Sequence, residues 1–271
     1  MEKVMRGTTI TKSKSASAKT SFCELFVLVK KGHEECGDSA FAFCDEDKAV
    51  IGVFDGVSGE AGAASASSQA ADAVLACLKK TGKCDDKKMR EAISKAQNAI
   101  DNGFTTAVIL FVEKDGSFVI ASIGDSPAYG INSEGNVELE LPLARAVGSG
   151  DSLFKFLHFR NLVTSVMGPG GGEASLHVRK GKLKKGEMFL LASDGLSDNL
   201  WLKVKEGYVV DCSGSDDLKK MVGKKKSPKK IVQKLAAEME KRIRGGRKEE
   251  KDSLLDPKTD DIAMAVITFI K

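Results

Sequence analysis

The sequence predicts an α+β fold in which antiparallel sheets pack together and helices cover their outer faces. Three observations favour this class. Apolar, β-prone segments come in runs, long helical segments lie between those runs, and a tight turn at Asp115-Gly116 joins two strands directly. A regular alternation of single strands and helices would instead indicate a parallel sheet. The 271 residues are enough for one large core, so we expect one domain.

Short apolar segments bounded by turn residues predict the strands. Residues 49–54 are wholly apolar, which is typical of a strand buried on both faces. Residues 106–112 and 118–123 flank the hairpin turn. The other expected strands are 22–29, 39–44, short strands within 129–141, 187–193 and 262–270.

Three segments predict helices. Residues 58–78 are rich in alanine and contain no proline, and residues 85–100 have one apolar face. A third helix is expected to start at Ser227-Pro228, because serine caps a helix and proline fits its first turn, and to end at Gly245-Gly246. Residues 144–172 are glycine-rich and predict irregular structure. We expect residues 1–20 to form a flexible tail and residues 21–271 to form the folded domain.

Composition excludes several classes of protein. The chain has 42 Lys+Arg against 38 Asp+Glu, and no apolar run reaches the ~18 residues of a membrane-spanning helix. Residues 1–20 lack the apolar core of a secretory signal. The six cysteines form no CxxC pair and the three histidines no HxH or HExxH spacing, which disfavours a zinc site. We therefore expect reduced thiols, a cytoplasmic protein, and oxygen ligands for any metal.

Two other features have a simple structural explanation. The basic stretch within residues 219–248 could bind nucleic acid or an anionic membrane, but Trp201 is the only tryptophan and no aromatic residues are interleaved with the lysines. We interpret it as a solvated surface and expect neither nucleic acid nor membrane as a partner. The glycine run at 168–172 lacks both the GxGxxG and the P-loop pattern, so a mobile flap is a better interpretation than a phosphate cradle.

Acidic residues stand where apolar strands end. Asp55-Gly56 and Asp194-Gly195 directly follow such strands, and a carboxylate held at the edge of a core must be paired or must coordinate a cation. The alternative is a strand-end turn with the acid in solvent. Further acids at similar junctions are Asp38, Asp125, Asp198 and Asp260-Asp261. Converging carboxylates raise one another's pKa unless cations lie between them, and Mg²⁺ or Mn²⁺ suits an all-oxygen site.

The ordered set of these motifs resembles the metal-dependent serine/threonine protein phosphatases of the protein phosphatase 2C type. The resemblance covers residues 34–270, and it implies a four-layer αββα sandwich of two antiparallel sheets flanked by helices. The motifs are, in chain order, Gly37-Asp38, Val53-Phe-Asp-Gly-Val-Ser-Gly59, Phe104-Thr-Thr-Ala107, Ser122-Ile-Gly-Asp-Ser-Pro-Ala128, Leu191-Ala-Ser-Asp-Gly-Leu-Ser-Asp198 and Asp260-Asp-Ile262.

The resemblance also implies the residues of a metal centre with two Mn²⁺ or Mg²⁺ ions. Asp55 would bridge the two ions, and the carbonyl of Gly56 would bind the second. Asp194 and Asp260 would complete the shell of the first ion, and Asp38 would support the centre through bound water. Asp55, Asp194 and Asp260 are thus the expected catalytic residues.

Asp125 and Asp198, together with Asp194, match positions that hold a third, looser ion in many members of the family. A variable flap is expected within residues 131–186. The implied reaction is hydrolysis of phosphoserine or phosphothreonine by a hydroxide that bridges the metal ions, without a phosphoenzyme. We expect phosphorylated proteins as substrates and a monomeric enzyme.

The chain departs from the family pattern at four positions. His33 stands where many members have a phosphate-binding arginine, so His33 is either a weak substrate contact or a surface histidine. Val57 replaces a histidine, Gly37 replaces a glutamate, and Ser165 replaces an arginine. These differences leave open a catalytically weak or inactive protein of this fold that binds a regulatory partner. A second alternative is a binding module that uses the basic surface.

Overall fold

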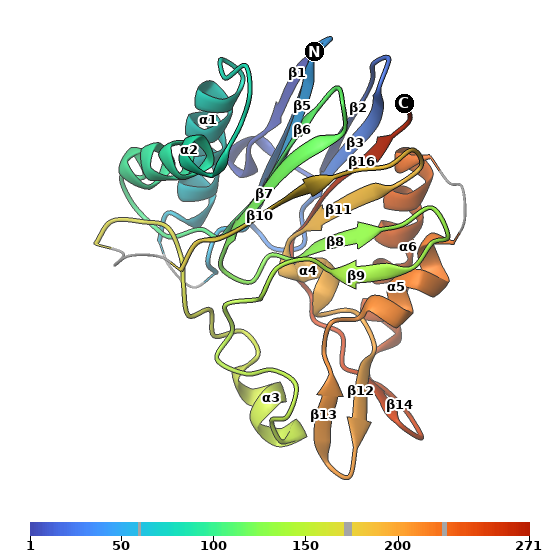
Figure 1. Ribbon diagram of the computed structural model, residues 1–271. Helices are drawn as coiled ribbons and strands as arrows, with labels where there is room; N and C mark the ends of the chain where they lie inside the picture. Colours follow the sequence, from blue (N-terminus) through green and yellow to red (C-terminus); the bar gives the residue numbers. More distant parts are fainter. Residues whose placement is uncertain (59–60, 171–174, 224–226) are drawn as a thin grey trace.

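The computed structural model describes residues 1–58, 61–170, 175–223 and 227–271. Gly59 of the second motif, Gly171 and Gly172 of the glycine run, and lysines 224–226 of the basic stretch lie outside these ranges. Two six-stranded antiparallel sheets pack face to face and form the centre of the molecule (Figure 1).

The first sheet has the strand order β1-β4-β5-β6-β7-β10, and the second has the order β2-β3-β16-β11-β8-β9. The first contains β1 (Glu2–Met5), β4 (Ser39–Cys44), β5 (Lys48–Phe54), β6 (Ala107–Glu113), β7 (Ser117–Ile123) and β10 (His177–Lys182). The second contains β2 (Ser13–Lys19), β3 (Cys23–Lys30), β8 (Ala128–Ile131), β9 (Val137–Leu139), β11 (Met188–Ala192) and β16 (Ile262–Phe269). Every pairing within these sheets is antiparallel, as the sequence predicted.

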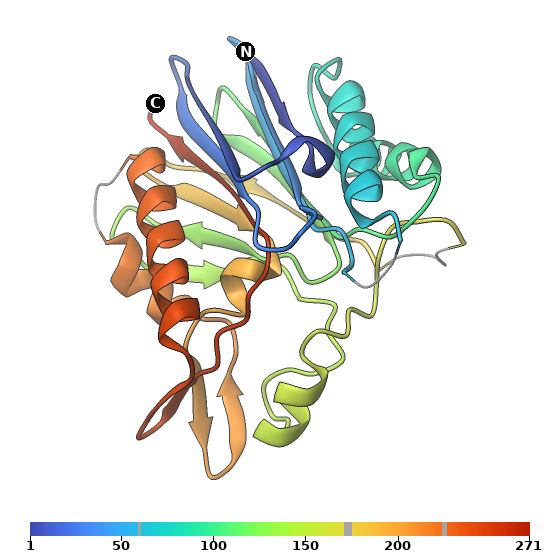
Figure 2. The same cartoon turned by 180° about the vertical axis from the view of Figure 1, so that it is seen from behind.

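Helices cover both outer faces of the sandwich, which gives the four expected layers (Figures 1 and 2). α1 (Ala63–Leu78) and α2 (Asp86–Ala99) pack on the first sheet, whereas α5 (Ser215–Val222) and α6 (Pro228–Gly245) pack on the second. The remaining helices are η1 (Gly7–Thr9), α3 (Leu153–Phe159) and the short α4 (Asp194–Ser197). No helix in the described ranges is both long and apolar enough to cross a membrane.

The residues of β5 explain why a wholly apolar run forms this strand. Side chains alternate between the two faces of a strand. Ile51 and Val53 therefore enter the core between the sheets, while Val50 and Phe54 enter the core beneath α1 and α2. Both faces are buried, so residues 49–54 include no polar position.

Residues 1–20 do not form the flexible tail that we expected. β1 pairs with β4 at the edge of the first sheet, and β2 pairs with β3 at the edge of the second. Met5 and Ile10 are buried and anchor the segment in the core. The three serines and two of the four lysines that suggested a tail lie on β2, and charged and small residues are typical of edge strands.

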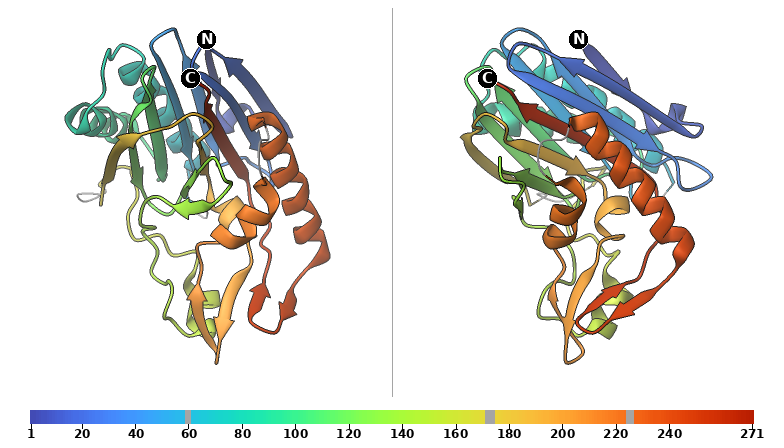
Figure 3. Two further views of the ribbon diagram at one scale, coloured as in Figure 1. Left: turned by 45° about the vertical axis from the view of Figure 1, so that its right-hand side comes forward. Right: turned by 90° about the vertical axis from the view of Figure 1, so that its right-hand side faces the viewer.

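A small third sheet projects from one end of the sandwich together with α3 (Figure 3). Its strand order is β13-β12-β15-β14, and the sequence pattern predicted none of these strands. The four strands are β12 (Leu202–Lys205), β13 (Tyr208–Asp211), β14 (Lys248–Glu250) and β15 (Ser253–Leu255). α3 lies within the segment predicted to be irregular, and the Ser152 side chain caps it by accepting a hydrogen bond from the backbone of Lys155.

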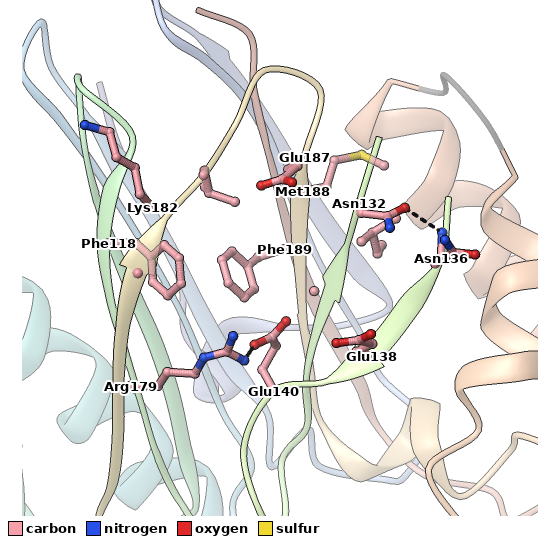
Figure 4. Close-up of a pocket in the computed structure, with 14 residues that line it drawn as sticks. Phe118, Asn132, Asn136, Glu138, Glu140, Arg179, Lys182, Glu187, Met188 and Phe189 are labelled. Carbon is pink, nitrogen blue, oxygen red and sulfur yellow. Dashed lines mark hydrogen bonds and ion pairs between the residues drawn. The ribbon is translucent and has the colours of Figure 1, made fainter. Parts of the chain in front are cut away.

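A pocket of about 240 Å³ opens between β10 of the first sheet and β8, β9 and β11 of the second (Figure 4). Phe118 and Phe189 form an edge-on aromatic pair at its base, and Arg179 forms an ion pair with Glu140. None of the acids that the sequence singled out lines this pocket. The chemistry of those acids must therefore be sought elsewhere.

Candidate metal centre

The acids at the strand ends come together where the two sheets meet. Asp38 precedes β4 and Asp55 follows β5, and these strands are paired neighbours in the first sheet. Asp194 follows β11, and Asp260 precedes β16, which pairs with β11 in the second sheet. Adjacent antiparallel strands bring one strand's end beside the next strand's start. Each sheet therefore contributes two of the acids.

Two hydrogen bonds join these acids across the sheets. The hydroxyl of Ser193 donates to Oδ2 of Asp38 at 2.7 Å, and the backbone N–H of Asp194 donates to Oδ2 of Asp55 at 3.3 Å. The backbone carbonyl of Asp55 accepts from the hydroxyl of Thr105 and from the backbone N–H of Thr106, both at 2.8 Å. The position of Asp55 is thus fixed by both sheets.

Gly56 lies in a position that only glycine can occupy. A Cβ atom there would be 2.4 Å from the carbonyl oxygen of Ala63 and 2.7 Å from that of Gly37. The backbone N–H of Gly56 donates to the carbonyl of Gly37 at 3.2 Å, which holds the Asp55-Gly56 turn against the residue before Asp38.

No basic side chain of the described residues forms an ion pair with Asp38 or Asp55. Burial raises the pKa of both carboxyls well above the ordinary range. The nearby carboxylates add to the shift, chiefly Asp261 for Asp38 and Asp194 for Asp55. Such a pair is the natural place for a hard cation, because a cation would remove the cost of burying both charges.

Lys258 reaches into the cluster and contacts three of its acids. Its Nζ lies 2.6 Å from Oδ2 of Asp260, 3.4 Å from Oδ2 of Asp194 and 3.8 Å from Oδ2 of Asp198. Burial alone would lower the pKa of Lys258, but these carboxylates raise it overall. Buried Asn199 fixes the backbone of Lys258, since its side chain accepts from the N–H and donates to the carbonyl of that residue.

Arg145 occupies the far side of the cluster. Its Nε lies 2.9 Å from Oδ2 of Asp125, and its Nη2 lies 2.8 Å from Oδ1 of Asp198. Burial raises the pKa of Asp125, and the neighbouring Asp194 and Asp198 raise it further. Arg145 lowers this pKa, but by less, so that the pKa of Asp125 is about 6. The structure thus links Asp125 and Asp198 to the other acids, although sequence reasoning missed the arginine between them.

Asp261 has a different role from its neighbour Asp260. Its carboxylate accepts three backbone hydrogen bonds, from Gly32 at 2.6 Å, His33 at 3.2 Å and Gly37 at 2.6 Å. It therefore holds the loop that carries His33 and leads into Asp38. The imidazole of His33 is half-exposed, and its Nε2 lies 3.1 Å from Oδ1 of Asp260.

The acids that best suit hard divalent cations are those around Asp38 and Asp55. In the described ranges, no three His, Cys, Asp or Glu side chains converge closely enough to hold a metal ion as the molecule stands. The uncompensated carboxylates of Asp38 and Asp55, beside Asp194 and Asp260, are the oxygen ligands that Mg²⁺ and Mn²⁺ prefer. Asp125 and Asp198 both pair with Arg145, which offsets part of their negative charge.

Comparison with known proteins gives one family match. Residues 30–236 match the family model described as protein phosphatase 2C. A search of curated proteins found no significant match.

Solved structures share the fold at low sequence identity. RsbX in complex with magnesium is 16% identical, with a TM-score of 0.62, over 94% of this chain and 100% of its own. The Mycobacterium tuberculosis serine/threonine phosphatase PstP/Ppp is 16% identical, with a TM-score of 0.62, over 92% of this chain and 100% of its own. The S. agalactiae serine/threonine phosphatase is 16% identical, with a TM-score of 0.64, over 92% of this chain and 100% of its own.

Proposed function

Because this chain belongs to the protein phosphatase 2C family, we propose that it is a metal-dependent phosphatase that hydrolyses phosphoserine and phosphothreonine in proteins. One observation carries the proposal. Acids from distant parts of the chain meet where the sheets join. Two of them, the buried Asp38 and the half-buried Asp55, form no ion pair with a basic side chain of the described residues. A phosphatase that uses hard cations needs this arrangement.

The proposed ligands are those that the family pattern assigns. Asp55 would bridge two Mn²⁺ or Mg²⁺ ions with help from the carbonyl of Gly56, Asp194 and Asp260 would hold the first ion, and Asp38 would act through bound water. Bound divalent cations lower the pKa of water and offset negative charge on a phosphoryl group.

The protein's own side chains would mainly position these groups. The Asp194 N–H orients the carboxylate of Asp55, and Ser193 orients that of Asp38. Cys36, two residues before Asp38, is buried, and burial together with Asp38 raises its pKa, so this thiol stays protonated at neutral pH. A cysteine nucleophile is therefore not part of the proposed mechanism.

The test is hydrolysis of p-nitrophenyl phosphate and of a phosphothreonine peptide. We expect turnover with added Mn²⁺ and none with EDTA. Asp55→Asn should lower turnover by more than about 100-fold, because losing even an indirect contact to a metal ligand costs 10–100-fold. The matched control is Asp115→Asn, which changes the exposed Asp-Gly of the β6–β7 hairpin and should leave turnover unchanged. Turnover in EDTA would contradict the proposal.

One observation favours a second function, that of an inactive or weakly active family member that binds a regulatory partner. Lys258 lies 2.6 Å from Asp260 and 3.4 Å from Asp194, which are the proposed ligands of the first ion. The ammonium group therefore competes with that ion for the same oxygens. Metal binding without turnover of either substrate would support this second function.

A further inference from the structure

Arg145 is buried between two acids of the centre. The exposed fraction of its side chain is 6%, and those of the Asp125 and Asp198 side chains are 1% each. The guanidinium group donates to Asp125 through Nε at 2.9 Å and pairs with Asp198 through Nη2 at 2.8 Å. Nη2 also donates to the hydroxyl of Ser197 at 3.1 Å. Arg145 thus pairs with both carboxylates, and Lys258 lies 3.8 Å from the other oxygen of Asp198.

The backbone places this arginine firmly. The N–H of Ala144 donates to the carbonyl of Gly124 at 3.0 Å, which ties the arginine's neighbour to the loop that carries Asp125. Arg145 also forms an antiparallel bridge with Val163, and the N–H of Thr164 donates to the carbonyl of Ala144 at 2.7 Å. Arg145 therefore enters the cluster from a paired segment rather than from a free loop.

We propose that Arg145 permanently replaces a third metal ion between Asp125 and Asp198, so that this centre takes two divalent ions and not three. A divalent ion between the two carboxylates would compete with the guanidinium group for Oδ2 of Asp125 and Oδ1 of Asp198, although neither oxygen of Asp198 accepts a hydrogen bond. It would also lie close to a buried positive charge, where repulsion is strong because little water screens it. This inference rests on the proposed function, since it concerns the number of ions in the same centre.

The experiment counts the Mn²⁺ ions bound per chain, by equilibrium dialysis with elemental analysis and by electron paramagnetic resonance of free Mn²⁺. The wild-type protein should bind two ions. Arg145→Met removes the charge but keeps an unbranched stem, and it should bind a third ion. Arg145→Lys keeps a positive charge and should still bind two. The matched control is Arg179→Met, which breaks the ion pair with Glu140 at the distant pocket of Figure 4 and should also bind two.

A second variant keeps the test decisive if Arg145→Met does not fold, which circular dichroism would reveal. Asp125→Asn removes a carboxylate of the supposed third site, and under this proposal the protein still binds two ions. Three ions or a single ion on the wild-type protein, two on folded Arg145→Met, or loss of an ion in Asp125→Asn would each overturn the inference while leaving the proposed function in place. No bound Mn²⁺ on the wild-type protein would overturn both.

Discussion

Lys258 is the residue whose position departs most from what the acidic motifs alone suggest. It lies two residues before Asp260, and Asn199 at the end of α4 fixes its backbone. Its ammonium group offsets the repulsion between Asp194 and Asp260 when no other cation is present. In the proposed centre, this ammonium group would compete with the first ion for the oxygens of Asp194 and Asp260.

Lys258→Met should bind Mn²⁺ more tightly than the wild-type protein. The substitution removes a positive charge within 4 Å of the proposed ligands, and Coulomb's law at an effective dielectric constant of ~20 makes this worth at least about tenfold in affinity. Isothermal titration calorimetry measures the effect. The control is Lys229→Met, an exposed position on α6. Unchanged or weaker binding in Lys258→Met would show that the lysine does not compete with the metal.

The strand-end acids could be predicted from single residues and their spacing, but their partners could not. Asp-Gly after an apolar run marks a position at a strand end, whatever the rest of the chain does. Arg145 and Lys258 stand in segments without periodicity, so nothing in the sequence fixes where their side chains point. The different roles of Asp260 and Asp261 likewise depend on the loop at residues 32–37, which only the fold brings close.

The contact between α4 and β16 is the element-level feature on which the centre depends. Gly195, in the first turn of α4, lies against the backbone of Asp261, and a Cβ atom at this glycine would be 1.8 Å from the carbonyl oxygen of Asp261. This close approach brings Asp194 to the same place as Asp260.

Gly195→Ala should separate α4 from the start of β16. We expect the free energy of unfolding to fall by about 1–3 kcal/mol, the usual cost of overpacking, and Mn²⁺ affinity to fall with it because Asp194 moves. Urea denaturation and calorimetry measure the two effects. Gly82→Ala is the control, since nothing lies within 4 Å of a Cβ atom at that exposed glycine. Wild-type values in Gly195→Ala would mean that the contact is unimportant.

Elements with a strong local pattern were predicted well, and weakly patterned elements were missed. α6 begins at Pro228 and ends at Gly245, as the Ser-Pro and Gly-Gly pairs predicted, although the Ser227 side chain makes no capping hydrogen bond. β5 follows its apolar run. The β12–β13 hairpin was missed because its strands are short and its turn, Glu206-Gly207, is not a common hairpin signal, although both residues adopt positive φ. Edge strand β2 was missed because it has few apolar residues.

The basic stretch does not form one continuous charged face. Arg242 is buried against Asp217, with Nη2 3.1 Å from Oδ1, and it also donates to the carbonyl of Asn199. This arginine joins α5, α6 and the end of α4. Part of the positive charge in residues 219–248 is thus paired within the protein and does not face a partner. The structure therefore supports a basic binding module less than it supports either a phosphatase or an inactive family member.

At the scale of the whole molecule, the acidic centre links the two sheets, and its charge makes the stability of the protein depend on pH. Asp38, Asp55 and Asp125 have raised pKa values in the folded protein, because burial and neighbouring carboxylates favour their protonated forms. Groups of this kind stabilise the fold below their unfolded pKa, and that contribution is lost as the pH rises through their folded pKa.

In EDTA, the free energy of unfolding should therefore fall between about pH 4.5 and pH 7. A shift of the Asp125 pKa from 3.8 to about 6 corresponds to at most about 3 kcal/mol. Mn²⁺ should raise the melting temperature more at pH 7 than at pH 5, because protons compete with the metal for these carboxylates. Thermal melts at both pH values, with KCl as the control salt, test this. Greater stability at pH 7 than at pH 5 in EDTA would contradict the expectation.

The pairing of residues 2–5 and 13–19 with β4 and β3 matters for anyone who shortens this protein. A recombinant version starting at residue 21 would lack β1 and β2, which are edge strands of the first and second sheets. It would leave two rows of backbone hydrogen-bonding groups open to water and would uncover the cavities left by Met5 and Ile10. We expect such a product to aggregate through its unpaired edge strands. The aggregation would be caused by the truncation and would not be a property of the full chain.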